Sequence, residues 1–428
     1  MAFLGMRGNG DWITNQQPEN WRETILFLFP NGDAPLTAIM SKMASEKTTD
    51  PTFHWFEKGL PAQRATVTNV FIDVLSTAYT TGGSAGDALY VQGSAAHIGE
   101  FRVGHQVLLR NSDNYADDTN ARVTARVING ANSYVVVSLL QDDPTTTGIA
   151  DCDTMLVIGN INAEGAQMPD AIAYYPTEYS NYTQIFRTPL SITRTARLTK
   201  LRTGDQYKEA KRECLQMHSI EQEKAFLWGY ATSGTGDNGK PMKTTQGLIT
   251  AIRASSASVQ SHFVTDSTVP GIDGSSWLDK GEEWLDYYLE QIFRYGSGER
   301  MCFVGSGVIL QLNKLIKLYG TYNISPQTTS YGIKVMTWET PFGTLHMKRH
   351  PLFSYEATNR NTMVVFDPSD LKYRFITDTT FYDDPDKKNT GRNRIDGTDE
   401  EFLTECGLEY HHMSKCAFLT GFGSDNTN

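Results

Sequence analysis

A glycine-rich segment in the middle of the chain has the composition of a phosphate-binding loop. Gly234-Thr-Gly-Asp-Asn-Gly-Lys240 fits the first seven positions of the P-loop motif, whose backbone amides and lysine hold phosphates. The eighth position is Pro241, which lacks the hydroxyl that binds Mg²⁺, and a predicted helix precedes the segment where a strand is required. We therefore interpret it as a glycine-rich turn and expect no nucleotide cofactor.

A second segment has the spacing of a serine nucleophile. Gly82-Gly-Ser84-Ala-Gly86 matches the Gly-x-Ser-x-Gly elbow, which needs a tight strand-to-helix turn beside oxyanion donors. The residues that follow, Asp87-Ala-Leu-Tyr-Val91, are more typical of a strand than of a helix. A flexible hinge between β units is the better interpretation, and an esterase-like hydrolase is a less favoured alternative.

Two groups of residues have types that bind metals. Cys406, His411, His412 and Cys416 resemble a zinc set, but they lack the close Cys-x-x-Cys pair of structural zinc sites. Asp383, Asp384 and Asp386 are not followed by the glycine and glutamate of a calcium loop. The sequence therefore predicts no catalytic, cofactor-binding or metal site.

Composition argues against nucleic-acid-binding, membrane-spanning and secreted classes of protein. The 428 residues include 38 basic and 49 acidic side chains, a net charge of −11, which argues against broad electrostatic binding of nucleic acid. The apolar run Ile25–Phe29 is far shorter than the roughly 20 residues that span a bilayer, and no secretory signal is recognisable at residues 1–11. Five scattered cysteines indicate reduced thiols in a cytosolic setting.

Periodicity divides the chain into regions of different type. Residues 1 to about 60 are aromatic and irregular, so they form either an arm that buries its rings against another surface or a lobe on their own chain. Alternating residues predict a strand around 66–79 that ends at a glycine-rich break, and the later strands around 101–109, 121–128, 133–140 and 154–158 are typical of a small barrel or sandwich. Strands are also predicted at 182–195.

The second half of the chain mixes helices and strands. A long helix is predicted over 205–231, with Tyr207, Ala210, Cys214 and Met217 on its apolar stripe. A loop follows at 234–243. Helices at 277–295 and 306–318 flank a buried strand at 300–304, which indicates a compact α/β unit. Further strands are predicted at 334–339, 344–348, 363–367, 373–377, 402–410 and 416–421, with a polar loop at 383–401.

Three stretches resemble the major capsid proteins of tailed bacteriophages, whose Johnson fold also forms encapsulin shells. The first runs from Tyr182 to Ala196 and leads into the long helix, like an extended loop returning to a spine helix. The second, Trp338 to Leu352, resembles the strand that re-enters after the axial domain. The third joins Met363–Arg374 to the tail from Gly407 to Phe422, like the closing strands of the peripheral domain.

The resemblance implies an α+β Johnson fold with an inserted small β-barrel or sandwich. It implies the following parts: an N-terminal arm at 1–60, an extended loop at 61–88 and 161–195, an inserted β domain at 89–160, a peripheral domain at 196–261 and 344–428 that includes the spine helix at 205–231, and an axial domain at 262–343. Whether the insert faces outward or contacts a neighbouring subunit is left open.

The same resemblance implies a non-enzymatic structural protein without cofactors. It would self-assemble as hexamers and pentamers into an icosahedral shell, in the virion, after assembly in the host bacterial cytoplasm. Portal, scaffold or decoration proteins are the expected partners, double-stranded DNA is enclosed without sequence-specific binding, and no membrane is involved. A phage tail or spike protein with β modules is the main alternative.

Overall fold

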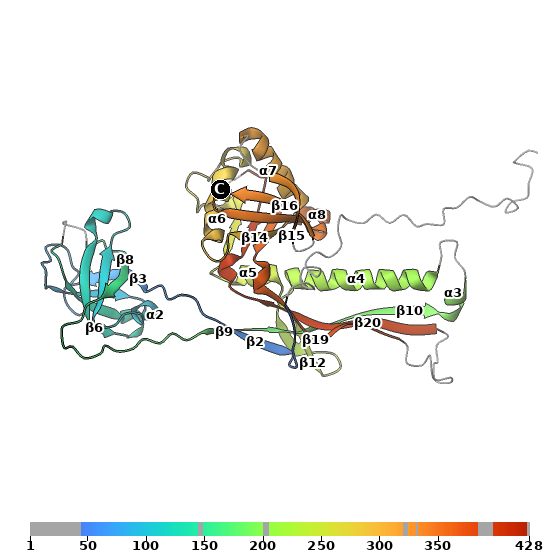
Figure 1. The fold of residues 1–428 in the computed structure, drawn as a ribbon, viewed down its shortest axis with the longest axis horizontal. Helices are drawn as coiled ribbons and strands as arrows, with labels where there is room; N and C mark the ends of the chain where they lie inside the picture. The colour runs from blue at the N-terminus through green and yellow to red at the C-terminus, as the bar shows by residue number, and fades with distance from the viewer. Residues whose placement is uncertain are drawn as a thin grey trace, which may run out of the picture. The chain divides into compact units, whose positions relative to one another are not determined.

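The computed structural model describes residues 44–143, 149–199, 205–319, 324–330, 333–383 and 397–425. Helices and sheets occur together, which confirms the α+β class (Figure 1). The chain divides into two compact units. One is Phe56–Thr177, and the other combines Met1–Trp55 with Glu178–Asn428.

The smaller unit is a closed six-stranded barrel. Its order is β3-β4-β7-β6-β5-β8, and α2 (Ala95–Ile98) is its short helix. The strands are β3 (Arg64–Phe71), β4 (Ala88–Gly93), β5 (His105–Arg110), β6 (Thr119–Val127), β7 (Tyr134–Leu139) and β8 (Thr154–Asn160). Alternate side chains point inward, as in β7, where Val135 and Val137 are fully buried. The predicted barrel is therefore confirmed.

The barrel starts earlier in the chain than the inserted domain expected at 89–160. Strand β3 lies within residues 61–88, where one side of an extended loop was expected, and it pairs with both β4 and β8. Ala65, Val67 and Val70 on β3 are buried in the barrel core. Closure explains the difference, because without β3 the edges of β4 and β8 would stay unpaired.

The larger unit contains a four-stranded sheet beneath a long helix (Figure 1). The sheet order is β1-β19-β20-β10, with β1 (Ser45–Lys47), β19 (Leu371–Tyr382), β20 (Gly397–Tyr410) and β10 (Gln184–Thr193). Helix α3 (Arg194–Leu198) follows β10, and α4 (Gln206–Trp228) is the long helix. The side chain of Asp205 caps α4 by accepting from the amide of Tyr207.

The predicted helix at 205–231 is thus confirmed, but part of its predicted apolar stripe is wrong. Cys214 is buried and Tyr207 packs beside it, whereas Met217 is 57% exposed. The next position facing the sheet is His218, four residues after Cys214. The apolar pattern did not indicate position 218, because a hydrogen-bonded histidine occupies it.

A seven-stranded sheet with flanking helices forms the rest of the larger unit. Its order is β13-β21-β18-β14-β17-β16-β15. The strands are β13 (Val259–His262), β14 (Glu299–Val304), β15 (Ile324–Ser330), β16 (Ile333–Thr340), β17 (Gly343–Arg349), β18 (Thr362–Phe366) and β21 (Ala417–Thr420). The helices are α5 (Leu248–Ala254), α6 (Trp277–Phe293), α7 (Ser306–Tyr319) and α8 (Pro351–Tyr355). The predicted α/β unit around β14 is confirmed.

Two short ribbons complete the described strands. One pairs β2 (Thr52–Glu57) with β9 (Thr177–Tyr182), and the other pairs β11 (Thr232–Thr235) with β12 (Pro241–Thr244). The second is a hairpin where the sequence predicted a loop. All five cysteines are free and buried, as expected for reduced thiols. Among the described residues, no helix has the length and apolar character needed to cross a membrane.

Candidate functional site

The P-loop-like segment forms the tip of the β11–β12 hairpin. The amide of Gly236 donates to the carbonyl of Lys240 at 2.8 Å, and the amide of Gly239 donates to the carbonyl of Gly236 at 2.9 Å. The amide of Lys240 donates to the side chain of Asn238. These amides are used to close the turn, so they do not form a phosphate cradle. The interpretation as a turn is confirmed.

The segment around Ser84 lies in a loop of the barrel before β4. The amide of Ser84 donates to Asp87 and the amide of Ala85 donates to Asp142, both at 2.8 Å. An oxyanion hole needs free amides where negative charge develops, whereas these amides already bind carboxylates. The geometry therefore does not support the esterase alternative.

The cysteines and histidines near the C-terminus do not meet as a metal site. Among the described residues, no group of three or more His, Cys, Asp or Glu side chains has the arrangement of a metal centre. Burial raises the pKa of Cys406 and of Cys416 to about 12, so both are protonated thiols. His411 instead binds Glu409 at 2.6 Å. Asp384 and Asp386 lie outside the described residues.

A buried His–Glu contact joins the last turns of α4 to the junction between β17 and α8. His350 Nε2 lies 2.8 Å from Glu223 Oε1, and both side chains are at most 1% exposed. The amide of Leu352 donates to His350 Nδ1, which caps α8. Because Nδ1 accepts from the amide of Leu352, Nε2 is the nitrogen that donates the hydrogen bond to Glu223. The imidazole therefore links α4 to α8.

A second buried histidine joins α4 to the four-stranded sheet. His218 Nδ1 lies 2.9 Å from the Thr188 hydroxyl on β10, and Nε2 lies 2.8 Å from the Thr404 hydroxyl on β20. The side-chain amide of Gln222 also contacts Nε2 at 2.8 Å. Burial lowers the pKa of His218 because the charged form would lose its hydration.

Sequence reasoning missed both histidine contacts. The contacts of His218 with Thr404 and of His350 with Glu223 both join residues more than a hundred positions apart in the sequence. The one available signal was the spacing of His218 four residues after Cys214 on the inward face of α4. These contacts position structural elements and do not by themselves form a reactive site.

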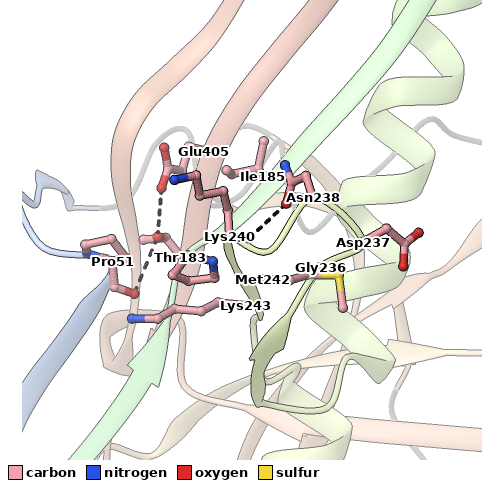
Figure 2. A pocket seen from close by; sticks show the side chains of 11 residues that line it. Pro51, Thr183, Ile185, Gly236, Asp237, Asn238, Lys240, Met242, Lys243 and Glu405 are labelled. Carbon is pink, nitrogen blue, oxygen red and sulfur yellow. Dashed lines mark hydrogen bonds between the residues drawn. The ribbon is translucent and has the colours of Figure 1, made fainter.

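The larger unit also contains an open pocket of about 730 Å³ between the β11–β12 hairpin and the start of β10 (Figure 2). Ile185 and Met242 line it and are 58% and 57% exposed. Pro51 adds a further apolar wall, and two charges of each sign line the pocket, from Lys240, Lys243, Asp237 and Glu405. The pocket is therefore a largely apolar surface with a mixed-charge rim.

Hydrogen bonds fix the walls of this pocket. The amide of Thr183 donates to the carbonyl of Pro51 at 2.9 Å, and its hydroxyl donates to Glu405 at 3.3 Å. The Lys243 ammonium donates to the Thr52 hydroxyl at 2.6 Å. The Lys240 side chain points toward Glu405 and Ile185, whereas Asp237 points away (Figure 2). The pocket thus has walls fixed by hydrogen bonds and a lysine directed at its acidic residue Glu405.

The β10 strand beside the pocket has one open face and one open edge. Its buried side chains alternate with exposed ones, and the exposed set includes Ile185 and Arg187. Arg187 forms a two-point ion pair with Glu401 on this face, with both contacts at 2.7 Å. In the described part of the chain, β10 pairs only with β20. Such a surface is suited to contact with another protein chain.

Comparison with known proteins gives matches that span nearly the whole chain. Residues 7–423 match the family model described as SU10 major capsid protein. The major capsid protein of Pseudomonas phage PaMx41 is 26% identical over 415 residues, covering 93% of this chain and 91% of that protein.

Solved structures with partial similarity include phage capsids and encapsulins. The capsid of Myoviridae phage XM1 has a TM-score of 0.44 and 8% identity, covering 96% of this chain and 99% of that one. The SrpI encapsulin of Synechococcus elongatus PCC 7942 has a TM-score of 0.39 and 12% identity, covering 59% and 78%.

Proposed function

The chain belongs to the SU10 major capsid protein family, and we propose that it is the subunit that self-assembles into the icosahedral shell of a tailed phage. The match over residues 7–423 is the observation that carries this proposal, because it includes both compact units. The major capsid protein of Pseudomonas phage PaMx41, aligned over 93% of this chain, supports it.

The proposed parts of the subunit follow the Johnson fold. Residues 1–60 act as the N-terminal arm, and 61–88 with 161–195 as the extended loop, shortened by the barrel strand β3. The barrel is the inserted domain proposed for 89–160. The peripheral domain takes 196–261 and 344–428, with α4 as its spine helix, and the axial domain takes 262–343. The arrangement of α4 over β10 and β20 supports this division.

We further propose that the subunit is structural and not an enzyme. The amides of the glycine-rich segments close turns or bind carboxylates, which leaves them unable to bind a phosphate or an oxyanion. The net charge of −11 suits a container that must not grip its DNA tightly during packaging and release. Double-stranded DNA would be enclosed without sequence-specific contacts.

Assembly would use many weak contacts repeated by symmetry. Hexamers and pentamers of this chain are the proposed units, since closed symmetry satisfies every copy of an interface. Portal, scaffold or decoration proteins are proposed partners. The virion is the proposed location, with assembly in the cytoplasm of the host bacterium.

Electron microscopy of the purified protein, alone and expressed with its phage partners, tests this proposal. We expect capsomers or closed shells built of this chain. Sedimentation in parallel measures the fraction of protein in large assemblies. Persistent monomers under every condition, with native helix content by circular dichroism, would contradict the proposed function.

A further inference from the structure

The pocket beside β10 has apolar surface that the described residues leave open to water. Ile185 and Met242 both remain more than half exposed, although they lie on neighbouring walls. Covering such surface contributes about 25 cal/mol for each Å² removed from water. The volume of about 730 Å³ lies in the range that accepts a ligand or a few side chains of a peptide.

The chain carries an apolar segment outside its described residues. Ile25-Leu-Phe-Leu-Phe29 is a run of five apolar residues, and Arg22 and Glu23 stand just before it. In extended conformation Glu23, Ile25, Phe27 and Phe29 share one face. This face offers apolar side chains next to a charge, which is also the composition of the pocket and its rim.

We propose that this pocket receives the segment Ile25–Phe29 from the arm of a second copy of the chain. The inference rests on the proposed function, because it needs many copies in contact. Phe27 would enter between Ile185 and Met242. Glu23, which shares the face of Phe27, would meet Lys240 on the rim, which offers the opposite charge.

The direction of β1 favours an arm from a second copy, and not the chain's own arm, as the occupant of the pocket. Strand β1 runs parallel to β19, from Ser45 opposite Tyr373 to Lys47 opposite Phe375. The pocket residue Glu405 pairs with Thr377, further along β19 in the same direction. Strand β1 therefore begins at its end farther from the level of its own pocket, and there the carbonyl of Ala44 accepts from the amide of Tyr373.

The arm is long enough to reach a neighbour. Phe29 lies fifteen positions before Ala44, and at about 3.3 Å per residue an extended chain covers that separation over about 50 Å. This span exceeds the width of the four-stranded sheet, whose strands lie about 4.8 Å apart.

Cysteine cross-linking between two differently marked chains tests the proposal. One chain carries Met242→Cys and the other carries Phe27→Cys, and the two are co-expressed and oxidised after assembly. The five native cysteines are buried and do not compete. The matched control is Ser233→Cys with Phe27→Cys, because Ser233 is exposed on the same hairpin but does not line the pocket.

We expect about tenfold more cross-linked dimer with Met242→Cys than with Ser233→Cys, because docking raises the effective concentration of the paired thiols. Equal yields in intact particles would overturn the inference and leave the proposed function standing. A chain carrying both Met242→Cys and Phe27→Cys, diluted in excess wild type, measures closure within one chain. An intramolecular product in that sample would also overturn the inference, in favour of the chain's own arm.

A second variant tests the same pocket without cross-linking. Met242→Glu places a charge on the pocket wall, and Met242→Leu keeps it apolar. We expect Met242→Glu to reduce the yield of assembled particles and Met242→Leu to preserve it. Normal assembly of Met242→Glu would contradict the proposal, whereas failure of the wild-type protein to assemble would contradict the proposed function itself.

Discussion

The strand edges differ between the barrel and the α4–sheet region, which is α4 with the four-stranded sheet β1-β19-β20-β10. In the barrel every strand pairs on both sides, and a compact apolar core fills the interior. In the α4–sheet region the edge of β10 and one face of its sheet are open within the described residues. The core beneath α4 includes buried polar groups, among them His218 and Glu223.

The closed barrel and the open sheet therefore suit different roles in the subunit. A closed barrel with an apolar core needs no partner to satisfy its backbone. Specific polar contacts hold the helix on its sheet in one defined geometry. The open face of that sheet remains available for contact with neighbouring chains. We therefore expect the barrel to be stable on its own and the α4–sheet region to form contacts with neighbouring subunits.

Truncating the barrel core is expected to have the largest effect. Phe101 is fully buried in the barrel, and Phe101→Ala should lower the free energy of unfolding of this unit by about 4 kcal/mol through lost burial and a cavity. Hydrogen exchange should speed up in β4 to β8 and stay unchanged in α4. Faster exchange in α4 as well would show that the barrel is not independent.

Removing the buried carboxylate of Glu223 is expected to have the next largest effect. Glu223→Ala leaves the Nε2 proton of His350 without its acceptor and should cost about 3 kcal/mol in urea unfolding. Exchange should rise in α4 and α8 and not in the barrel. Glu213→Ala on the exposed side of α4 is the matched control, and an equal loss in both variants would refute the role of the contact.

Acid should weaken the α4–sheet region through His218. Its pKa is lowered in the fold by burial, so the unfolded chain binds the proton more tightly and stability falls as the pH drops below about 6.5. One proton limits the slope to about 1.4 kcal/mol per pH unit. His218→Gln should reduce the slope between pH 7 and pH 5.

Urea midpoints at several pH values measure this effect. The matched control is His97→Gln in the barrel, because His97 is exposed and should leave the slope as in the wild type. A slope that stays the same in His218→Gln would contradict the assignment of His218.

The ion pair on the open face of β10 is expected to have the smallest effect. The Arg187 side chain is 62% exposed, so Arg187→Ala should change the free energy of unfolding by about 0.5 kcal/mol at most. Because this face is proposed for assembly, the variant should change particle yield more than monomer stability. A large loss of monomer stability would show that the ion pair stabilises the monomer and would contradict its proposed role in contacts between subunits.

The sequence predicted the elements better than the contacts between them. Alternating residues in β6 and β7 and the spacing of apolar residues in α6 are local signals, and these elements were found. The inclusion of β3 in the barrel was missed because ring closure depends on pairing with β8, almost ninety residues away. Periodicity contains no information about such pairing.

At the candidate site, too, the sequence predicted local structure but not contacts between distant residues. The sequence correctly predicted a turn at Gly234–Lys240, since glycine and asparagine favour turns. It did not indicate the pocket, because Pro51, Ile185 and Glu405 meet the hairpin only through the fold. His350 was also missed, as nothing local marks a histidine that caps one helix and binds a glutamate of another.

Hydrogen exchange of the free subunit and of assembled particles tests the central claim most directly. We predict that assembly protects amides in the β11–β12 hairpin, in β10 and in the N-terminal arm, while the core strands of the barrel exchange as in the free subunit. Protection confined to the barrel, or no change in the hairpin and β10, would contradict the account.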